Sequence, residues 1–78
     1  MQEFVVHFTS AKEIQDFVNL CSQQPFRVMV GSERYHVNAT SFMGMFTLNC
    51  RFPLRAMAEC SVEEFQAFQQ EVQRFLVN

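Results

Sequence analysis

A chain of 78 residues with a net charge of −2 and 49% hydrophobic residues has the composition of one small globular domain, residues 1–78, rather than of a disordered segment. Its six basic residues are scattered, so they build no positive stripe for a phosphate backbone, and nucleic acid is not expected as a partner. The apolar runs are too short to span a membrane, and the N-terminus lacks the pattern of a signal peptide. We therefore expect a cytoplasmic protein without a membrane partner.

The three cysteines are too few and too far apart for the usual cysteine frameworks. Cys21, Cys50 and Cys60 match neither a set of disulfides nor a close-spaced zinc pair. Free thiols, with no bound metal and no cofactor, are expected. Cys21 falls on an apolar helical stripe, which predicts a small core residue.

The first predicted element is a strand over residues 3–8, where inward and outward side chains alternate and His7 faces away from the core. A helix follows, because Ser10 with Glu13 three residues later has the pattern of a capping box. The helix should bury one apolar stripe, formed by Ile14, Phe17, Val18 and Cys21.

Two short strands come next, over residues 26–30 and 34–37, and the turn residues 31–33 between them predict a β-hairpin. His36 lies within the second of these strands. The predicted inward side chains are Phe26, Val28, Val30, Tyr35 and Val37.

The last two predicted elements are a strand over residues 54–58 and a helix that begins after Ser61, which forms a second capping-box pattern with Glu64. On the outer face of this helix, Glu71 and Arg74 are spaced as an ion pair. The buried stripe of the helix should contain Phe65, Phe68, Val72, Phe75 and Leu76.

The resulting order of elements is βαββαβα, which predicts an α+β fold with helices packed on one face of a split sheet. Each strand has one apolar face and each long helix has one apolar stripe, so this arrangement buries all of them in a single core. The expected core residues are Phe4, Val6, Phe17, Val28, Val30, Phe65, Phe68 and Phe75.

The segment over residues 37–49 fits local rules less well than the rest of the chain. Thr40 or Ser41 can cap a short helix, and at about 100° per residue one side of it collects Phe42, Met45, Phe46 and, at the margin, Leu48. Met43 points elsewhere. An exposed methionine beside exposed apolar neighbours indicates a contact surface, and the alternative is a short core helix with one outlying methionine.

The same segment resembles the histidine-containing phosphocarrier protein (HPr) of the bacterial sugar phosphotransferase system, and more closely the catabolite-repression HPr paralogues of Gram-positive bacteria. Ser41, Met43, Gly44 and Leu48 match the family's Ser-Ile-Met-Gly-x-x-x-Leu run around its regulatory serine. The resemblance covers essentially the whole chain. It implies an open-faced β-sandwich with a four-stranded antiparallel sheet, a serine at Ser41 that an ATP-dependent kinase phosphorylates, and apolar neighbours that dock proteins such as that kinase or a transcriptional regulator.

The sequence departs from this family at the phosphocarrier site. The family carries His-x-Arg-Pro at the start of the first helix, whereas here Ser10 stands at the histidine position, Lys12 at the arginine and Glu13 at the proline. A serine hydroxyl cannot replace imidazole as a labile phosphoryl carrier, and the Glu13 carboxylate would repel phosphate. His7 and His36 lie inside predicted strands and are expected to be ordinary sheet residues.

Our leading hypothesis is a regulatory module without enzymatic or phosphocarrier activity, with Ser41 as its switch. It would bind a protein through the surface formed by Phe42, Met43, Met45 and Phe46. The simpler interpretation of Ser41 is that it only caps a helix. The second hypothesis is a protein with chemistry of its own, either phosphotransfer on His7 or His36 or an enzymatic reaction of a thiol. The third is a small ferredoxin-like domain that handles metal. Against the third hypothesis, the sequence contains no Cys-x-x-Cys motif, and its final helix has no counterpart in the ferredoxin-like fold.

Overall fold

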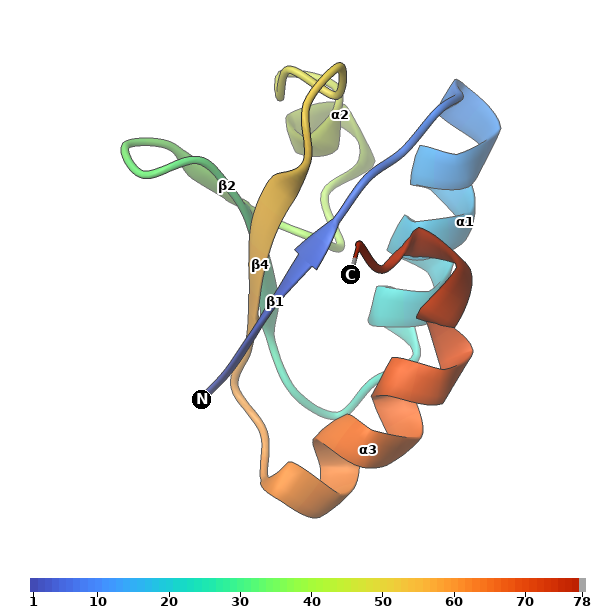
Figure 1. The fold of residues 1–78 in the computed structure, drawn as a ribbon, viewed down its shortest axis with the longest axis vertical. Coiled ribbons are helices and arrows are strands. Elements are labelled where there is room, and N and C mark those ends of the chain that lie inside the picture. The colour runs from blue at the N-terminus through green and yellow to red at the C-terminus, as the bar shows by residue number, and fades with distance from the viewer. Residues whose placement is uncertain (78) are drawn as a thin grey trace.

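The computed structural model describes residues 1–77 and shows an α+β fold built from a four-stranded antiparallel sheet and helices (Figure 1). The elements follow the predicted order. They are β1 (Gln2–Val6), α1 (Ala11–Ser22), β2 (Val28–Gly31), β3 (His36–Asn38), α2 (Phe42–Met45), β4 (Leu54–Ala58), α3 (Val62–Glu71) and the 3-10 turn η1 (Gln73–Phe75).

The strands lie in the order β1-β4-β2-β3, and every neighbouring pair is antiparallel. Helices α1 and α3 cover one face of this sheet, while α2 lies at one end of it (Figure 1). The central strand β4 turns only small or aliphatic side chains toward the helices, with Ala56 and Ala58 fully buried. Because alanine occupies little volume, the aromatic side chains of the helices can approach the sheet closely.

Phenylalanine rings fill the space between the sheet and the helices. Phe8, Phe17 and Phe75 meet pairwise with ring centroids 5.1 to 5.6 Å apart. Phe68 lies 6.0 Å from Phe4 and 5.4 Å from Phe26. Six of the predicted core residues are buried, namely Val6, Phe17, Val28, Val30, Phe68 and Phe75, and Phe4 and Phe65 are partly buried against them. Cys21 is buried in the same core, as predicted.

The hairpin differs from the prediction at Tyr35, whose side chain is 50% exposed rather than inward. Tyr35 belongs to the turn, where its carbonyl oxygen accepts a hydrogen bond from the Ser32 N–H at 2.9 Å, so the second strand begins only at His36. Gly31 is required by this close approach. A Cβ atom at that position would collide with the Tyr35 carbonyl oxygen.

The C-terminal stripe is confirmed at Phe68, Val72 and Phe75, but the α-helix ends at Glu71 and the chain continues as the 3-10 turn η1. After η1 the chain lies along β1, where the His7 N–H donates to the Phe75 carbonyl at 2.9 Å. The bridge between Val6 and Leu76 extends this contact. The C-terminal segment therefore covers part of a sheet edge, which would otherwise leave backbone groups unpaired.

Glu71 and Arg74 are both exposed, as expected of the outer face, but the predicted pair between them is wrong, because each side chain has a partner on α1 or just after it. The Arg74 guanidinium lies 2.9 Å from the Asp16 carboxylate, and the Glu71 carboxylate accepts a hydrogen bond from the Gln24 side chain at 2.9 Å. Both contacts join the C-terminal elements to the first helix. No helix among residues 1–77 is long and apolar enough to cross a membrane.

Replacing Phe68 with alanine should lower the free energy of unfolding by about 3 to 5 kcal/mol, because Phe68 is buried between two other rings. A loss of this size is comparable to the whole stability of a small domain. Chemical denaturation of the variant measures it. Gln69→Ala, at the exposed neighbouring position of α3, is the control and should leave stability nearly unchanged. Equal stabilities of the two variants would contradict this packing of α3.

Candidate functional site

Ser41 is the N-cap of α2, so the choice left open between Thr40 and Ser41 is settled in favour of Ser41. Its Oγ accepts a hydrogen bond from the Gly44 N–H at 3.2 Å. The preceding turn is fixed by Asn38, whose Oδ1 accepts from the Thr40 N–H at 2.9 Å and from the Thr40 hydroxyl at 2.8 Å. Although its oxygen is used in the cap, Ser41 remains exposed at the surface.

The helix α2 is only one turn long, and only Met45 within it is buried. Met45 is fully buried, so its predicted role as a partner contact is wrong: its side chain anchors α2 to the core. Phe42 and Phe46 were predicted on the buried side together with Met45 and are instead 37% and 43% exposed. Within the single turn only Met45 is buried, and the other large apolar side chains remain at the surface.

Three large apolar side chains of this region are exposed together. Met43 is 76% exposed and Phe46 is 43% exposed, while the rings of Phe42 and Phe46 contact each other with centroids 4.7 Å apart. We call Phe42, Met43 and Phe46 the α2 surface. Ser41 lies next to it in sequence, so the structure brings together three of the four predicted contact residues and the predicted switch.

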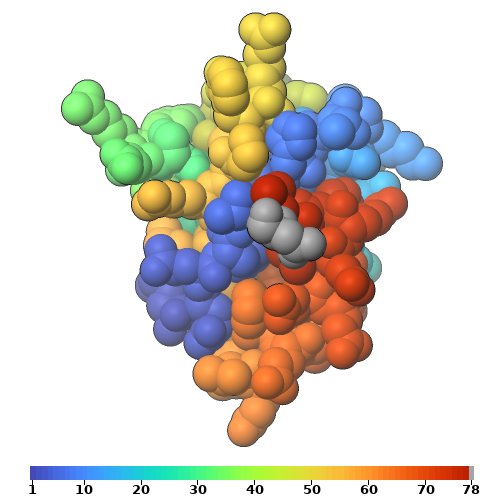
Figure 2. Space-filling view, in the orientation of Figure 1, coloured from blue at the N-terminus to red at the C-terminus, as the bar shows by residue number. Residues whose placement is uncertain are grey.

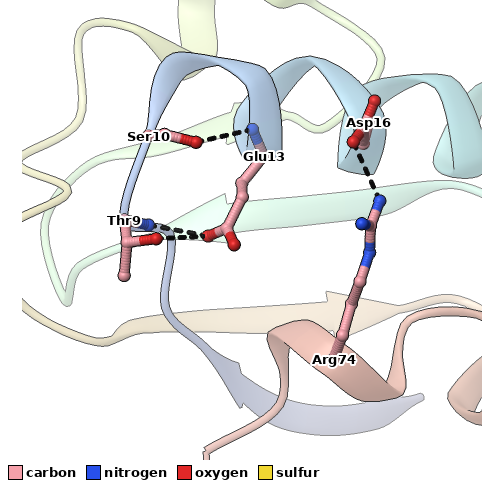
Figure 3. A network of polar contacts seen from close by, with 5 residues as sticks. All are labelled: Thr9, Ser10, Glu13, Asp16 and Arg74. Carbon is pink, nitrogen blue, oxygen red and sulfur yellow. Dashed lines mark hydrogen bonds and ion pairs between the residues drawn. The ribbon is translucent and has the colours of Figure 1, made fainter.

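The second predicted region is the start of α1, shown in Figure 3. The Ser10 Oγ accepts a hydrogen bond from the Glu13 N–H at 3.2 Å, as a capping residue does. The return bond differs from the predicted capping box, because the Glu13 carboxylate accepts from the Thr9 N–H at 2.8 Å and from the Thr9 hydroxyl at 3.0 Å. The hydrogen bond from the Thr9 backbone, and then that from its side chain, lower the pKa of Glu13.

These contacts place a negative charge at the start of α1. The N-terminus of a helix attracts anions, and here the protein's own Glu13 carboxylate already lies at that end, where it accepts from the Thr9 N–H and the Thr9 hydroxyl. A phosphoryl group on Ser10 would lie beside this carboxylate and would be repelled by it. Lys12, at the position of the family's arginine, is exposed on the first turn of the helix.

A shallow depression of about 430 Å³ lies between the start of α1 and the loop that follows α2. Its lining includes Ser10, Ala11, Ile14, Phe46, Cys50 and Arg51. Phe46 of the α2 surface and Ser10 therefore line the same depression. The sequence did not indicate the contribution of Cys50 and Arg51, because the loop that carries them has no periodic pattern.

Neither histidine lies at the start of a helix. His7 follows β1, and its Nε2 is 3.3 Å from the Arg51 carbonyl oxygen. His36 is exposed in the edge strand β3. His36 therefore has no helix N-terminus beside it, whereas His7 lines the depression at the start of α1 together with Ser10 and Ala11.

The thiols are suited to packing rather than to nucleophilic chemistry. Burial raises the pKa of Cys21 to about 12, and it also raises the pKa of Cys50 and of Cys60. The thiol rather than the thiolate is therefore the form present at neutral pH, whereas the thiolate is the reactive form. Within residues 1–77, no three His, Cys, Asp or Glu side chains are grouped so that they could hold a metal ion.

Comparisons with known proteins assign no family to the chain: no protein-family model matches it, and a search of curated proteins finds no match. The resemblance to HPr therefore rests on the residue pattern around Ser41 and on the order of helices and strands.

The lowered pKa of Glu13 predicts a specific dependence of stability on pH. Because hydrogen bonds from Thr9 favour the ionised carboxylate, its contribution is present above the ordinary pKa of 4.5 and is lost as the pH falls through the lowered value. Glu13→Gln keeps an acceptor but removes the charge. Its stability deficit against the parent chain should be largest near neutral pH and should disappear in strong acid, as measured by denaturation at several pH values.

Thr9→Val is the matched variant for this experiment. It removes the hydroxyl bond and keeps the stronger backbone bond, so it should show a smaller deficit with the same pH dependence. A deficit of Glu13→Gln that stays constant from neutral pH into acid would show that the bonds from Thr9 do not favour the ionised form.

Proposed function

We propose that this protein is an HPr-like regulatory module related to the phosphoenolpyruvate-dependent sugar phosphotransferase system. In this proposal it acts in the cytoplasm, has no enzymatic or phosphocarrier activity, and binds a protein partner through the α2 surface with Ser41 as its phosphorylation site. The single observation that carries the proposal is the exposure of Phe42, Met43 and Phe46 in one turn beside the exposed Ser41.

Exposed apolar clusters favour a binding role because keeping them in water is unfavourable unless a partner covers them. Phenylalanine and methionine are enriched at the centres of protein interfaces, and an unbranched methionine adapts its shape to the opposing surface. Met43 contributes little to the core, since 76% of its surface is exposed. Partner binding gives this position a physical role that folding does not.

Phosphorylation of Ser41 would change the charge of this region strongly. Residues 34–58 contain arginines but no aspartate or glutamate, so the phosphate would be the first negative charge in the segment. It would add about −1.5 to −2 charges next to the α2 surface. Because α2 is a single turn, its dipole is small, and we expect the phosphate to act on partner binding rather than through the helix.

The loss of phosphocarrier activity is supported by the start of α1. Ser10 offers a hydroxyl where the family has imidazole, and the Glu13 carboxylate lies where a bound phosphoryl group needs positive charge. Among the described residues, Glu13 is bonded to Thr9 and forms no ion pair with the neighbouring Lys12.

Incubation with phosphoenolpyruvate and the first enzyme of the phosphotransferase system should leave the mass of this protein unchanged, because no imidazole occupies the carrier position. Intact-mass spectrometry at neutral pH detects the labile phosphohistidine that a true carrier would form. An HPr with its histidine, treated in the same reaction, is the positive control. An acid-labile adduct on His7 or His36 would contradict the proposal.

The second prediction for this function concerns Met43 and uses the ATP-dependent HPr kinase of a Gram-positive bacterium as the partner. The kinase should phosphorylate the parent chain at Ser41, and Met43→Ala should slow this reaction because it removes a docking contact of more than about 1 kcal/mol. The stability of Met43→Ala should stay within about 0.5 kcal/mol of the parent, as for other exposed positions.

Three control variants separate docking from folding. Ser41→Ala should abolish phosphorylation, Thr40→Ala should retain it, and Val62→Ala removes an exposed apolar side chain on α3 and should leave the rate unchanged. Failure of the kinase to phosphorylate Ser41 would leave that residue as a helix cap alone. A loss of several kcal/mol of stability in Met43→Ala would place Met43 in the core and remove the docking surface.

A further inference from the structure

A second concave site lies away from Ser41, between the tip of the β2–β3 hairpin and the loop that leads into β4. In Figure 2 the hairpin (green) and this loop (yellow) stand out at the same end of the molecule, and the cleft between them has a volume of about 370 Å³. Two aromatic side chains line it, Tyr35 at 50% exposure and Phe52 at 63%. We call it the Tyr35–Phe52 cleft.

A chain of hydrogen bonds fixes Tyr35 in this cleft. The Thr47 hydroxyl donates its proton to the Gly44 carbonyl oxygen at 2.6 Å. It must therefore accept in its contact with the Tyr35 hydroxyl at 3.0 Å, where Tyr35 is the donor. This chain holds an exposed ring at a hairpin tip in one orientation, although folding alone gives no reason to order it. A preformed aromatic surface costs less conformational entropy when a ligand binds.

The lining of the cleft selects an uncharged ligand. None of its eight residues carries a charge, and the inner lining includes the apolar side chains of Leu48 and Leu54. A charged group bound here would lose water without gaining an opposite charge, which is unfavourable. The volume lies within the range of sites that bind small ligands or a few residues of a peptide.

The hydrogen-bonding groups of the cleft limit the class of ligand further. Tyr35 and Thr47 have already given their hydroxyl protons to other groups. The Asn49 Oδ1 accepts from the Arg51 N–H at 3.2 Å, while the Asn49 NH₂ group donates no hydrogen bond within residues 1–77. The Ser32 hydroxyl likewise forms no hydrogen bond within these residues. The side-chain donors that remain, the Asn49 amide and the Ser32 hydroxyl, can donate hydrogen bonds to carbonyl oxygens of a ligand.

We infer that the Tyr35–Phe52 cleft binds a proline-rich peptide segment, whose rings contact the two aromatic side chains and whose carbonyl oxygens accept from Ser32 and Asn49. Such segments are uncharged, preordered as polyproline II helices, and recognised in aromatic-lined grooves. A sugar ring would need partners for several hydroxyls, and this mainly apolar lining supplies few. The cleft shares no residue with Ser41 and the α2 surface, so its test does not depend on the function proposed above.

The protein carries its own probe for this test, because Tyr35 is its single tyrosine and it has no tryptophan. Titration with an acetylated and amidated decaproline peptide should change the tyrosine fluorescence of the full chain in a saturable manner. A Gly-Ser peptide of the same length and the neutral sugar maltose should not. Amide chemical shifts recorded in the same titration should move at residues 32–35 and 47–54 and stay constant in α3.

Variants locate the contact. Phe52→Ala should weaken the peptide affinity by about tenfold or more, as loss of an aromatic anchor does, while Val62→Ala, a similarly exposed apolar position on α3, should stay within about twofold. Circular dichroism checks that Phe52→Ala is folded. If it is not, Asn49→Ala replaces it and should also weaken binding.

Three outcomes would overturn the inference. They are the absence of saturable binding by decaproline, equal binding of the Gly-Ser peptide, and full affinity in both Phe52→Ala and Asn49→Ala. In the first of these cases, saturation by maltose would identify a sugar site instead.

Discussion

The contact of Phe8, Phe17 and Phe75 is the constraint on which the rest of this structure depends. The three rings come from the segment between β1 and α1, the middle of α1 and the 3-10 turn η1, and their centroids lie within 5.6 Å of one another. Arg74 reinforces the contact, since its guanidinium lies 4.6 Å above the Phe75 ring and pairs with Asp16. Because Phe8 precedes Thr9 directly, this packing also fixes where the start of α1 can lie.

Most of the fold could be predicted because the relevant signals are local. Alternation along a strand, a stripe along a helix and a serine followed by glutamate depend on residues within a few positions of one another, so the caps at Ser10 and Ser61 were identified from sequence. The errors have a different origin. The partner of Arg74 lies on another helix, and the exposure of Tyr35 follows from a turn whose geometry requires Gly31.

The candidate site was predictable only in part for the same reason. Spacing around one short helix correctly separates the exposed Met43 from the buried Met45, and the burial of Met45 contradicts its predicted role as a partner contact. The same spacing wrongly places Phe42 and Phe46 on the buried side, whereas the single-turn helix leaves both rings exposed. The depression beside Cys50 and the Tyr35–Phe52 cleft combine segments that are distant in the sequence. No local pattern indicates such sites, since they exist only after the sheet has brought those segments together.

A one-turn helix with three exposed apolar side chains would be unstable in isolation, because nucleating a helix costs more than a few hydrogen bonds return. Here its conformation is held from several sides: Met45 is buried in the core, the Ser41 hydroxyl caps Gly44, and the Thr47 hydroxyl joins the Gly44 carbonyl to Tyr35. Two of these contacts meet on the backbone of Gly44. A phosphate on Ser41 would therefore act on the peptide group that precedes the Gly44 Cα, and a ligand against Tyr35 would act on the peptide group that follows it.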